Sequence, residues 1–233
     1  MELTANEHKK VEIEVDGKVY ERYAIKTHFV GLGEDYIEIV KKYVSPEYKE
    51  GDFISISEKI VSLCQKRVVY KKDVKVSRLA KFLSKFAMKS DAGIGVDSPY
   101  KMQFAINICG KAKVIWAAIM GGIGKLFHKK GVFYKIVGQE VSGLDGFYDK
   151  VFSEYGEFGI RIPENSDGVC NEIYEKLGVK AMIVDANDIN VEILGKTSNI
   201  GYDDETLRKI IKDNPAGQSK QLTPIILIRP KQN

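Results

Sequence analysis

The sequence predicts a protein that combines β-strands with α-helices, because two different hydrophobic periods occur along the chain. Residues 9–15 alternate apolar and polar side chains, and Asp16-Gly17 and a second alternating run follow, which is a strong signal for a β-hairpin. Residues 77–89 place their apolar side chains at the three- and four-residue spacing of an amphipathic helix. We therefore expect strands and helices to share one fold.

Length, composition and cysteine content limit the class of protein. The 233 residues suffice for one large domain or two small ones, and 44% hydrophobic with 29% charged residues is ordinary for a globular protein. No apolar run is long enough to span a membrane, and the polar first ten residues do not resemble a signal peptide. The three cysteines, Cys64, Cys109 and Cys170, lie far apart and form neither a zinc pattern nor a disulfide framework. We expect a cytoplasmic protein with buried, structural cysteines.

The first third of the chain contains a candidate anion-binding region. The expected elements are a glycine-containing loop at 27–35, a helix at 36–43 and a strand at 53–57. Ser57, Lys59 and Ser62 cluster where this strand ends, which is a common position for anion-binding donors. The alternative is a strand with a polar exposed side. His28 can contact a ligand from the glycine loop, or simply be solvated there.

The middle of the chain is expected to contain helices and one long loop. The expected elements are a helix at 77–89 with Leu79, Phe82, Leu83 and Phe86 inward, a helix at 99–110, a buried helix at 114–120, a strand at 132–137 and a lid-like or dimer-arm loop at 138–162. Residues 121–126 lack the first glycine and the hydroxyl of a P-loop, so a helix end is expected there.

Charge is unevenly distributed, although the net charge of +4 is too small to argue for nucleic acid. Residues 66–89 carry nine Lys and Arg against one acid, Asp73. This run can attract an anionic ligand or be the solvated face of a helix.

The last third contains the most suggestive polar cluster. A short apolar run, 182–184, ends in Asp185, Asn187, Asp188 and Asn190, and a second apolar run follows. Carboxylates at the end of a buried strand suit a hard cation such as Mg²⁺ or Mn²⁺, although Asp and Asn also serve ordinary turns. The other expected elements are a helix at 166–177 between Asn165 and Gly178, a helix from Asp204, a loop at 216–224 and a strand at 225–228. That loop can bind phosphate or merely connect its neighbours.

Three stretches, in this order and spacing, resemble the coenzyme F-420 gamma-glutamyl ligase family, and the chain is most similar to a bacterial branch of ligase-like proteins. They are residues 51–62 with Arg67 beyond, residues 184–195, and residues 217–229. Residues 27–35 also resemble the family's first loop. The resemblance implies an α+β fold with mixed sheets and packed helices, and an intertwined homodimer. It further implies a single domain over 1–233, in which residues 72–162 can form an inserted subdomain.

The resemblance also suggests roles for individual residues. It places Asp185 at a metal-binding aspartate, Gln218 at a metal-binding glutamate and Gly95 at another metal aspartate, for which Asp97 can substitute. Ala186 and Leu63 stand where the family has a hydroxyl residue and a lysine. The nucleotide-contacting positions that it implies are His28, Phe29, Val30, Gly31, Ser57, Ser62, Gly217, Gln218 and Ser219.

The resemblance implies an amide-forming ligase that uses GTP or ATP and Mn²⁺ or Mg²⁺. The expected substrates are a small-molecule carboxylate and L-glutamate, with a homodimer as the assembly and neither nucleic acid nor a membrane as partner. The alternative is a non-catalytic protein that kept the fold and lost part of the metal site. Ala186, Gln218 and Gly95 favour this alternative, because fewer charged ligands weaken binding of a hard cation.

Overall fold

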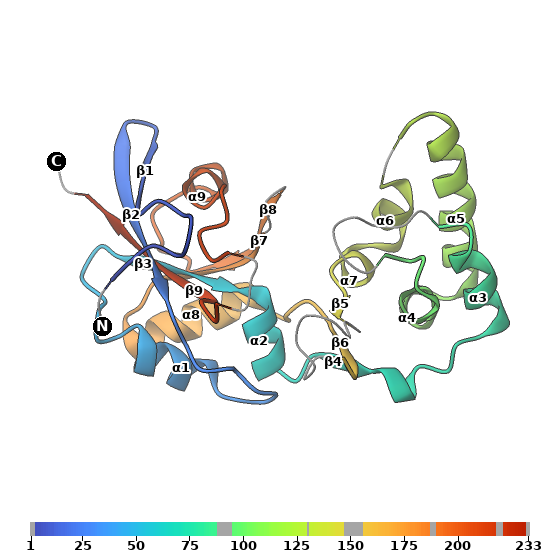
Figure 1. Ribbon diagram of the computed structural model, residues 1–233, viewed down its shortest axis with the longest axis horizontal. Helices are drawn as coiled ribbons and strands as arrows, with labels where there is room; N and C mark the ends of the chain where they lie inside the picture. Colours follow the sequence, from blue (N-terminus) through green and yellow to red (C-terminus); the bar gives the residue numbers. More distant parts are fainter. Residues whose placement is uncertain are drawn as a thin grey trace. The chain divides into compact units, whose positions relative to one another are not determined.

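A computed structural model describes residues 3–87, 95–129, 131–146, 156–186, 190–217 and 221–231. The chain forms two compact units (Figure 1). The first unit combines residues 1–66 with 163–233, and the second is the intervening segment, 67–162.

A six-stranded mixed sheet organises the first unit. Its strand order is β1 (Glu12–Val15), β2 (Lys18–Ile25), β9 (Ile225–Pro230), β3 (Phe53–Ser57), β7 (Ala181–Ala186) and β8 (Val191–Lys196). β3 and β7 are parallel, and the other neighbours are antiparallel. The predicted hairpin at the start of the chain is confirmed. Its turn residues, Asp16 and Gly17, both have positive φ, as a two-residue hairpin turn of type I′ requires.

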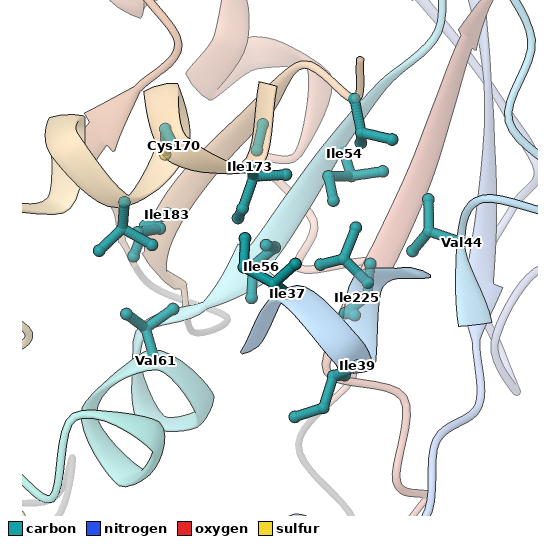
Figure 2. Close-up of a cluster of buried hydrophobic side chains, with 14 of the residues drawn as sticks. Ile37, Ile39, Val44, Ile54, Ile56, Val61, Cys170, Ile173, Ile183 and Ile225 are labelled. Carbon is teal, nitrogen blue, oxygen red and sulfur yellow. The ribbon is translucent and has the colours of Figure 1, made fainter. Parts of the chain in front are cut away.

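Helices cover both faces of this sheet. α1 (Tyr36–Tyr43), α2 (Glu58–Cys64) and α8 (Ser166–Leu177) pack on one face, and α9 (Asp204–Ile210) packs on the other (Figure 1). Successive side chains of the central strands point to opposite faces of the sheet, so these strands contribute to the hydrophobic core on each face. Ile54 and Ile183 point to one face, and Phe53 and Met182 point to the other. Figure 2 shows the first cluster, where Ile37 of α1 and Ile173 of α8 meet the strand side chains.

The helix boundaries of the first unit follow local capping chemistry. The Asp35 side chain accepts a hydrogen bond from the Ile37 amide at 2.7 Å, and Asp203 accepts one from the Thr206 amide at 2.7 Å. Gly178 closes α8 in the left-handed conformation. Burial in this unit also raises the pKa of the Cys64 and Cys170 thiols to about 12, which fits structural rather than nucleophilic cysteines.

The second unit is mainly helical. Its elements are a three-stranded sheet of order β4 (Val68–Tyr70), β6 (Phe158–Ile160), β5 (Asp145–Gly146), a short 3₁₀ turn η1 (Lys71–Asp73), and the helices α3 (Arg78–Ser84), α4 (Pro99–Cys109), α5 (Lys111–Leu126), α6 (Val132–Val137) and α7 (Gln139–Ser142). Its core contains Met102, Phe104 and Val114. Glu140 joins the two ends of the segment, because it pairs with Arg67 at 2.7 Å and with Arg161 at 2.9 Å.

One prediction for the second unit is wrong, because residues 132–137 form α6 rather than a strand. The helix end expected within 121–126 falls at Leu126, after α5 has continued through the glycines. A Cβ on Gly124 would lie 2.7 Å from Val132 Cγ2, so this glycine lets α6 lie directly against α5. Gly121 and Gly124 therefore allow close helix packing, and a six-residue apolar run fits a packed helix as well as a strand.

The predicted burial of the helices at 77–89 and 114–120 is also corrected. α3 ends at Ser84, and Phe82 and Phe86 are 58% and 70% exposed. In α5 the side chain of Val114 is buried, whereas Trp116 is 56% exposed. The predicted loop at 138–162 contains α7, β5 and β6 in its described part, and residues 147–155 lie outside the described residues.

Candidate functional site

Four chain segments meet at one edge of the first unit's sheet, namely the edge formed by the ends of its inner strands. Ser57, the last residue of β3, lies opposite Val184 in the parallel neighbour β7, so Asp185 follows at this edge. Ile56 and Ile25 both lie opposite Ile225, the first residue of β9. The segments that follow β2, β3 and β7, and the segment that precedes β9, therefore all lie here. Such an edge is a common place for ligands in sheets with parallel strands.

The loop after β2 is held in shape by its own side chains. The two ring nitrogens of His28 lie 2.8 Å from the Tyr43 hydroxyl and 2.6 Å from Glu34 Oε2. The Gly31 amide donates to the other Glu34 oxygen, Oε1. Burial by itself would raise the pKa of Glu34, but the hydrogen bonds from Gly31 and His28 lower it below its ordinary value. His28 thus organises this loop through both of its ring nitrogens.

The remaining predicted residues of this loop differ in their surroundings. Val30 is buried in the core cluster, so only its backbone is available to a ligand. Phe29 and Gly31 are half-buried. Contacts to a nucleotide from this loop would therefore be made chiefly by backbone groups, which suits phosphate recognition by main-chain amides.

Ser57 and Ser62 lie at different depths around α2. Ser57 is the N-cap residue of α2, and its side chain makes no capping hydrogen bond. Ser62 is fully buried, and its Oγ has no hydrogen-bond partner among the described residues. A buried hydroxyl without a partner costs about 1–3 kcal/mol. Ser57 is therefore the better placed of the two predicted serines to reach a ligand at the sheet edge.

The segment before β9 forms a tight glycine loop that the N-terminal segment braces. Asn6 donates hydrogen bonds to the Ala216 carbonyl at 2.7 Å and to the Thr223 hydroxyl at 3.0 Å. Gly217 has a φ of +74°, and a Cβ on it would lie 2.4 Å from Gln221 Oε1 and 2.7 Å from Asn6 Nδ2. Only glycine fits this position without displacing the bracing side chains. The predicted ligands Gln218 and Ser219 lie outside the described residues.

Asp185 is half-buried near the end of β7 and lies directly opposite Glu192 of β8. Directly opposed carboxylates in an antiparallel pair repel one another, so a cation between them would be favourable. A donor set made only of carboxylate oxygens suits a hard divalent cation. Asp185 and Glu192 are therefore candidate ligands by the chemistry of their oxygens, although two carboxylates supply only part of the ligand set that Mg²⁺ or Mn²⁺ takes.

The other predicted metal ligands do not join this pair in the described part of the chain. Asp97 belongs to the second unit, in the turn before α4, where its charge acts on Lys101 and Tyr134. Asn187 and Asp188, beside Asp185 in the sequence, lie outside the described residues. Within the described ranges, no group of three or more His, Cys, Asp and Glu side chains is arranged to hold a metal ion.

Sequence reasoning missed three residues that shape the site: Asn6, Glu34 and Glu192. Asn6 gave no signal, because its contacts are more than 200 positions away in the chain. The spacing from His28 to Glu34 across a glycine loop was a weak signal for a pair. Glu192 could have been found by drawing the 181–196 hairpin in register, since it pairs with Asp185.

Comparison with known families gives a match that covers most of this edge. A family model described as F420-0:gamma-glutamyl ligase matches residues 24–199, which is more than half of the chain. The matched range includes the loop after β2, Ser57 and Asp185, and it ends before the Gly217 loop. A search of curated proteins found no match.

Proposed function

The chain belongs to the F420-0:gamma-glutamyl ligase family, and from this premise we propose that it is a nucleotide-dependent ligase that forms an amide bond. The observation that carries the proposal is the convergence of four segments at one sheet edge. A glycine loop precedes β9 there, and a pair of carboxylates lies across β7 and β8. Phosphate groups and a divalent cation require these two kinds of site.

The proposed reaction has two steps. The carboxylate of the first substrate attacks the terminal phosphate of GTP or ATP, which gives an acyl phosphate and a nucleoside diphosphate. The amine of L-glutamate then attacks the acyl carbon, loses a proton and displaces inorganic phosphate. Holding both substrates in line is the main contribution of a protein to such chemistry.

We assign roles to the residues of the sheet edge on the basis of their positions. The backbone of residues 28–31 and the loop at Gly217 would hold the nucleotide phosphates, with Ser57 on the other side of the segment that precedes β9. Bracing by Glu34 and Asn6 fixes the shape of these loops before the ligand arrives. Asp185 and Glu192 would hold Mg²⁺ or Mn²⁺, which when bound neutralises phosphate charge.

Ligand-dependent stability tests this proposal. We expect Mn²⁺ or Mg²⁺ together with GTP or ATP to raise the melting temperature, since a ligand at 100 times its Kd stabilises by about 2.7 kcal/mol. Asp185→Asn should lose the metal-dependent part of this shift. Asp16→Asn is the matched control, because Asp16 lies in the hairpin turn at the opposite edge of the sheet. Absence of any shift in the wild-type protein would exclude a nucleotide- and metal-binding site.

A non-catalytic binding protein is the second candidate, and Ala186 favours it, because this position beside Asp185 has no side-chain oxygen. The two candidates differ in turnover. With glutamate and a panel of carboxylic acids, a ligase releases nucleoside diphosphate and inorganic phosphate in equal amounts, and Asp185→Asn should abolish this release. Nucleotide binding without release for any acid would favour the binding protein.

A further inference from the structure

The helical unit exposes an apolar stripe along α5. Its members are large side chains that are 38–78% exposed: Ile115, Trp116, Ile119, Ile123, Leu126 and the adjoining Phe127. At 3.6 residues per turn these six positions fall within roughly 120° of the helix circumference. The opposite side, with Val114 and Ala117, is buried in the core of the unit. The helix is therefore apolar on two sides, of which the core uses one.

Lysines border this α5 stripe on both sides. By helical position Lys113 lies along one border, and Lys111 and Lys125 lie along the other; all three are exposed. The surrounding sequence contains little negative charge, since residues 74–139 hold twelve Lys and Arg against two Asp. The stripe is thus an apolar strip with exposed lysines along both of its borders, in a part of the sequence that is rich in positive charge.

A second exposed site in the same unit has the same composition. Phe82 and Phe86 of the α3 region are exposed, with their ring centroids 5.0 Å apart. The exposed cations on this segment are Arg78, Lys81 and Lys85. Two segments of one unit therefore combine exposed large apolar side chains with neighbouring positive charge.

We propose that the helical unit docks on the surface of an anionic phospholipid bilayer. A helix with Lys on its polar flanks and Trp, Phe, Leu and Ile between them lies in the plane of the membrane interface. The lysine stems can lie along the apolar layer while their ammonium groups contact anionic headgroups. This is attachment to one leaflet, and no helix in the described part of the chain is long and apolar enough to cross a membrane.

Charge and side-chain type favour a bilayer over two other occupants. Two copies joined symmetrically through the α5 stripe would bring their lysine rows face to face, which opposes association. Nucleic acid is bound by cations and by stacking on aromatic rings, whereas four of the six stripe residues are aliphatic and do neither. Aliphatic side chains between cations match acyl chains below anionic headgroups.

Vesicle binding by the full-length protein tests the proposal. We expect co-sedimentation with vesicles that contain phosphatidylglycerol, weaker binding to vesicles of phosphatidylcholine alone, and weakening with added salt. Trp116 is the single tryptophan of the chain and belongs to the stripe, so its fluorescence emission should shift to shorter wavelength on binding.

Paired variants separate the stripe from general effects on the protein. Ile119→Ser combined with Ile123→Ser should weaken vesicle binding at least about tenfold, because the protein loses two isoleucine side chains that the bilayer would bury. Both residues are exposed in the free protein, so the helical circular dichroism and melting temperature should not change. Tyr174→Ser is the control, because Tyr174 is an exposed large side chain on α8 of the other unit.

Several results would overturn the proposal. Wild-type protein that ignores anionic vesicles, or that binds them without a change in Trp116 emission, would exclude docking through this stripe. Equal loss in the Tyr174→Ser control would have the same meaning. A dimer that the double isoleucine variant dissociates, or tight binding to single-stranded nucleic acid in place of vesicles, would identify a different occupant. The nucleotide experiments on the first unit do not depend on any of these outcomes.

Discussion

A deeply buried ion pair joins Asp52 to Arg229 and ties the turn before β3 to β9. The Asp52 side chain is 2% exposed and accepts from Arg229 Nε at 2.9 Å, from Arg229 Nη2 at 2.6 Å and from the Lys49 amide at 2.9 Å. The hydrogen bonds with Asp52 are the main cause of the raised pKa of Arg229. The aspartate therefore supplies both the charge and the acceptors that this buried guanidinium needs.

Replacing this carboxylate should destabilise the fold strongly. We expect Asp52→Asn to lower the free energy of unfolding by about 3 kcal/mol, because it leaves a largely buried guanidinium without its counter-charge. Lys231→Gln breaks the exposed pair between Lys231 and Glu12 and should cost less than about 1 kcal/mol. Urea unfolding measures both, and equal effects would show that Asp52 contributes no more than a surface pair.

Asp213 gives the first unit a predictable response to acid. Burial tends to raise the pKa of Asp213, but its hydrogen bonds and charge interaction with the buried Arg22 lower it below the ordinary value of 3.8. A lowered pKa in the folded state adds stability that is fully present above the ordinary value and is lost as the pH falls through the folded value. We therefore expect Asp213→Asn to flatten the acid limb of stability below about pH 4. Glu7→Gln, at an exposed position, should leave the loss of stability in acid unchanged. Urea unfolding at several pH values measures this loss, and an unchanged loss in Asp213→Asn would show that Asp213 does not cause it.

The glycine loop before β9 has no room for a side chain at position 217. Gly217→Ala adds a Cβ at positive φ and brings it against Asn6 and Gln221, so it should destabilise the protein by more than about 1 kcal/mol and weaken nucleotide-dependent stabilisation. Gly51→Ala is the matched control, because Gly51 also has positive φ but a Cβ there meets nothing within 4 Å. Strain alone would make the two variants alike, whereas a collision in the loop makes only Gly217→Ala impair the nucleotide response. Thermal shifts with GTP or ATP distinguish these results.

In each unit, hydrogen bonds join the two chain ends at which the chain passes to the other unit. Within the first unit, Gln65 and Glu164 exchange two hydrogen bonds of 2.8 Å between the Gln65 side chain and the Glu164 backbone. Within the second, the Arg161 amide donates to the Arg67 carbonyl at 2.9 Å. Each unit thus holds its two chain ends together without needing the other, which is typical of an inserted segment.

Removing the inserted segment should leave the first unit folded. We expect a chain in which a short glycine-rich linker replaces residues 67–162 to unfold cooperatively and to keep the nucleotide-dependent thermal shift, because the sheet-edge residues all lie in the first unit. A variant that also carries Gln65→Ala controls for closure of the ends and should be less stable. Loss of cooperative unfolding in the shortened chain would show that the first unit requires the second.

Local chemistry explains which parts of the fold the sequence predicted. The hairpin at Asp16-Gly17, the strand at 53–57 and the helix that begins after Asp35 follow from turn, alternation and capping signals within a few residues. The strand that carries Asp185 was predicted in the same way, although it continues to Ala186. The helix at 132–137 was missed because a short apolar run carries no unique period, and contact with α5 decided its conformation.

The sequence by itself determined the kinds of elements in the first unit, the family to which the chain belongs and the polar character of the segment after β7. Only the tertiary structure decided that β2, β3, β7 and β9 place their loops at one edge, that Glu192 opposes Asp185 and that Asn6 braces the Gly217 loop. It alone also showed that α5 leaves an apolar stripe exposed. The reason is that strand order, register and helix burial depend on contacts between distant segments, whereas turns, caps and periodicity depend on neighbours in the chain.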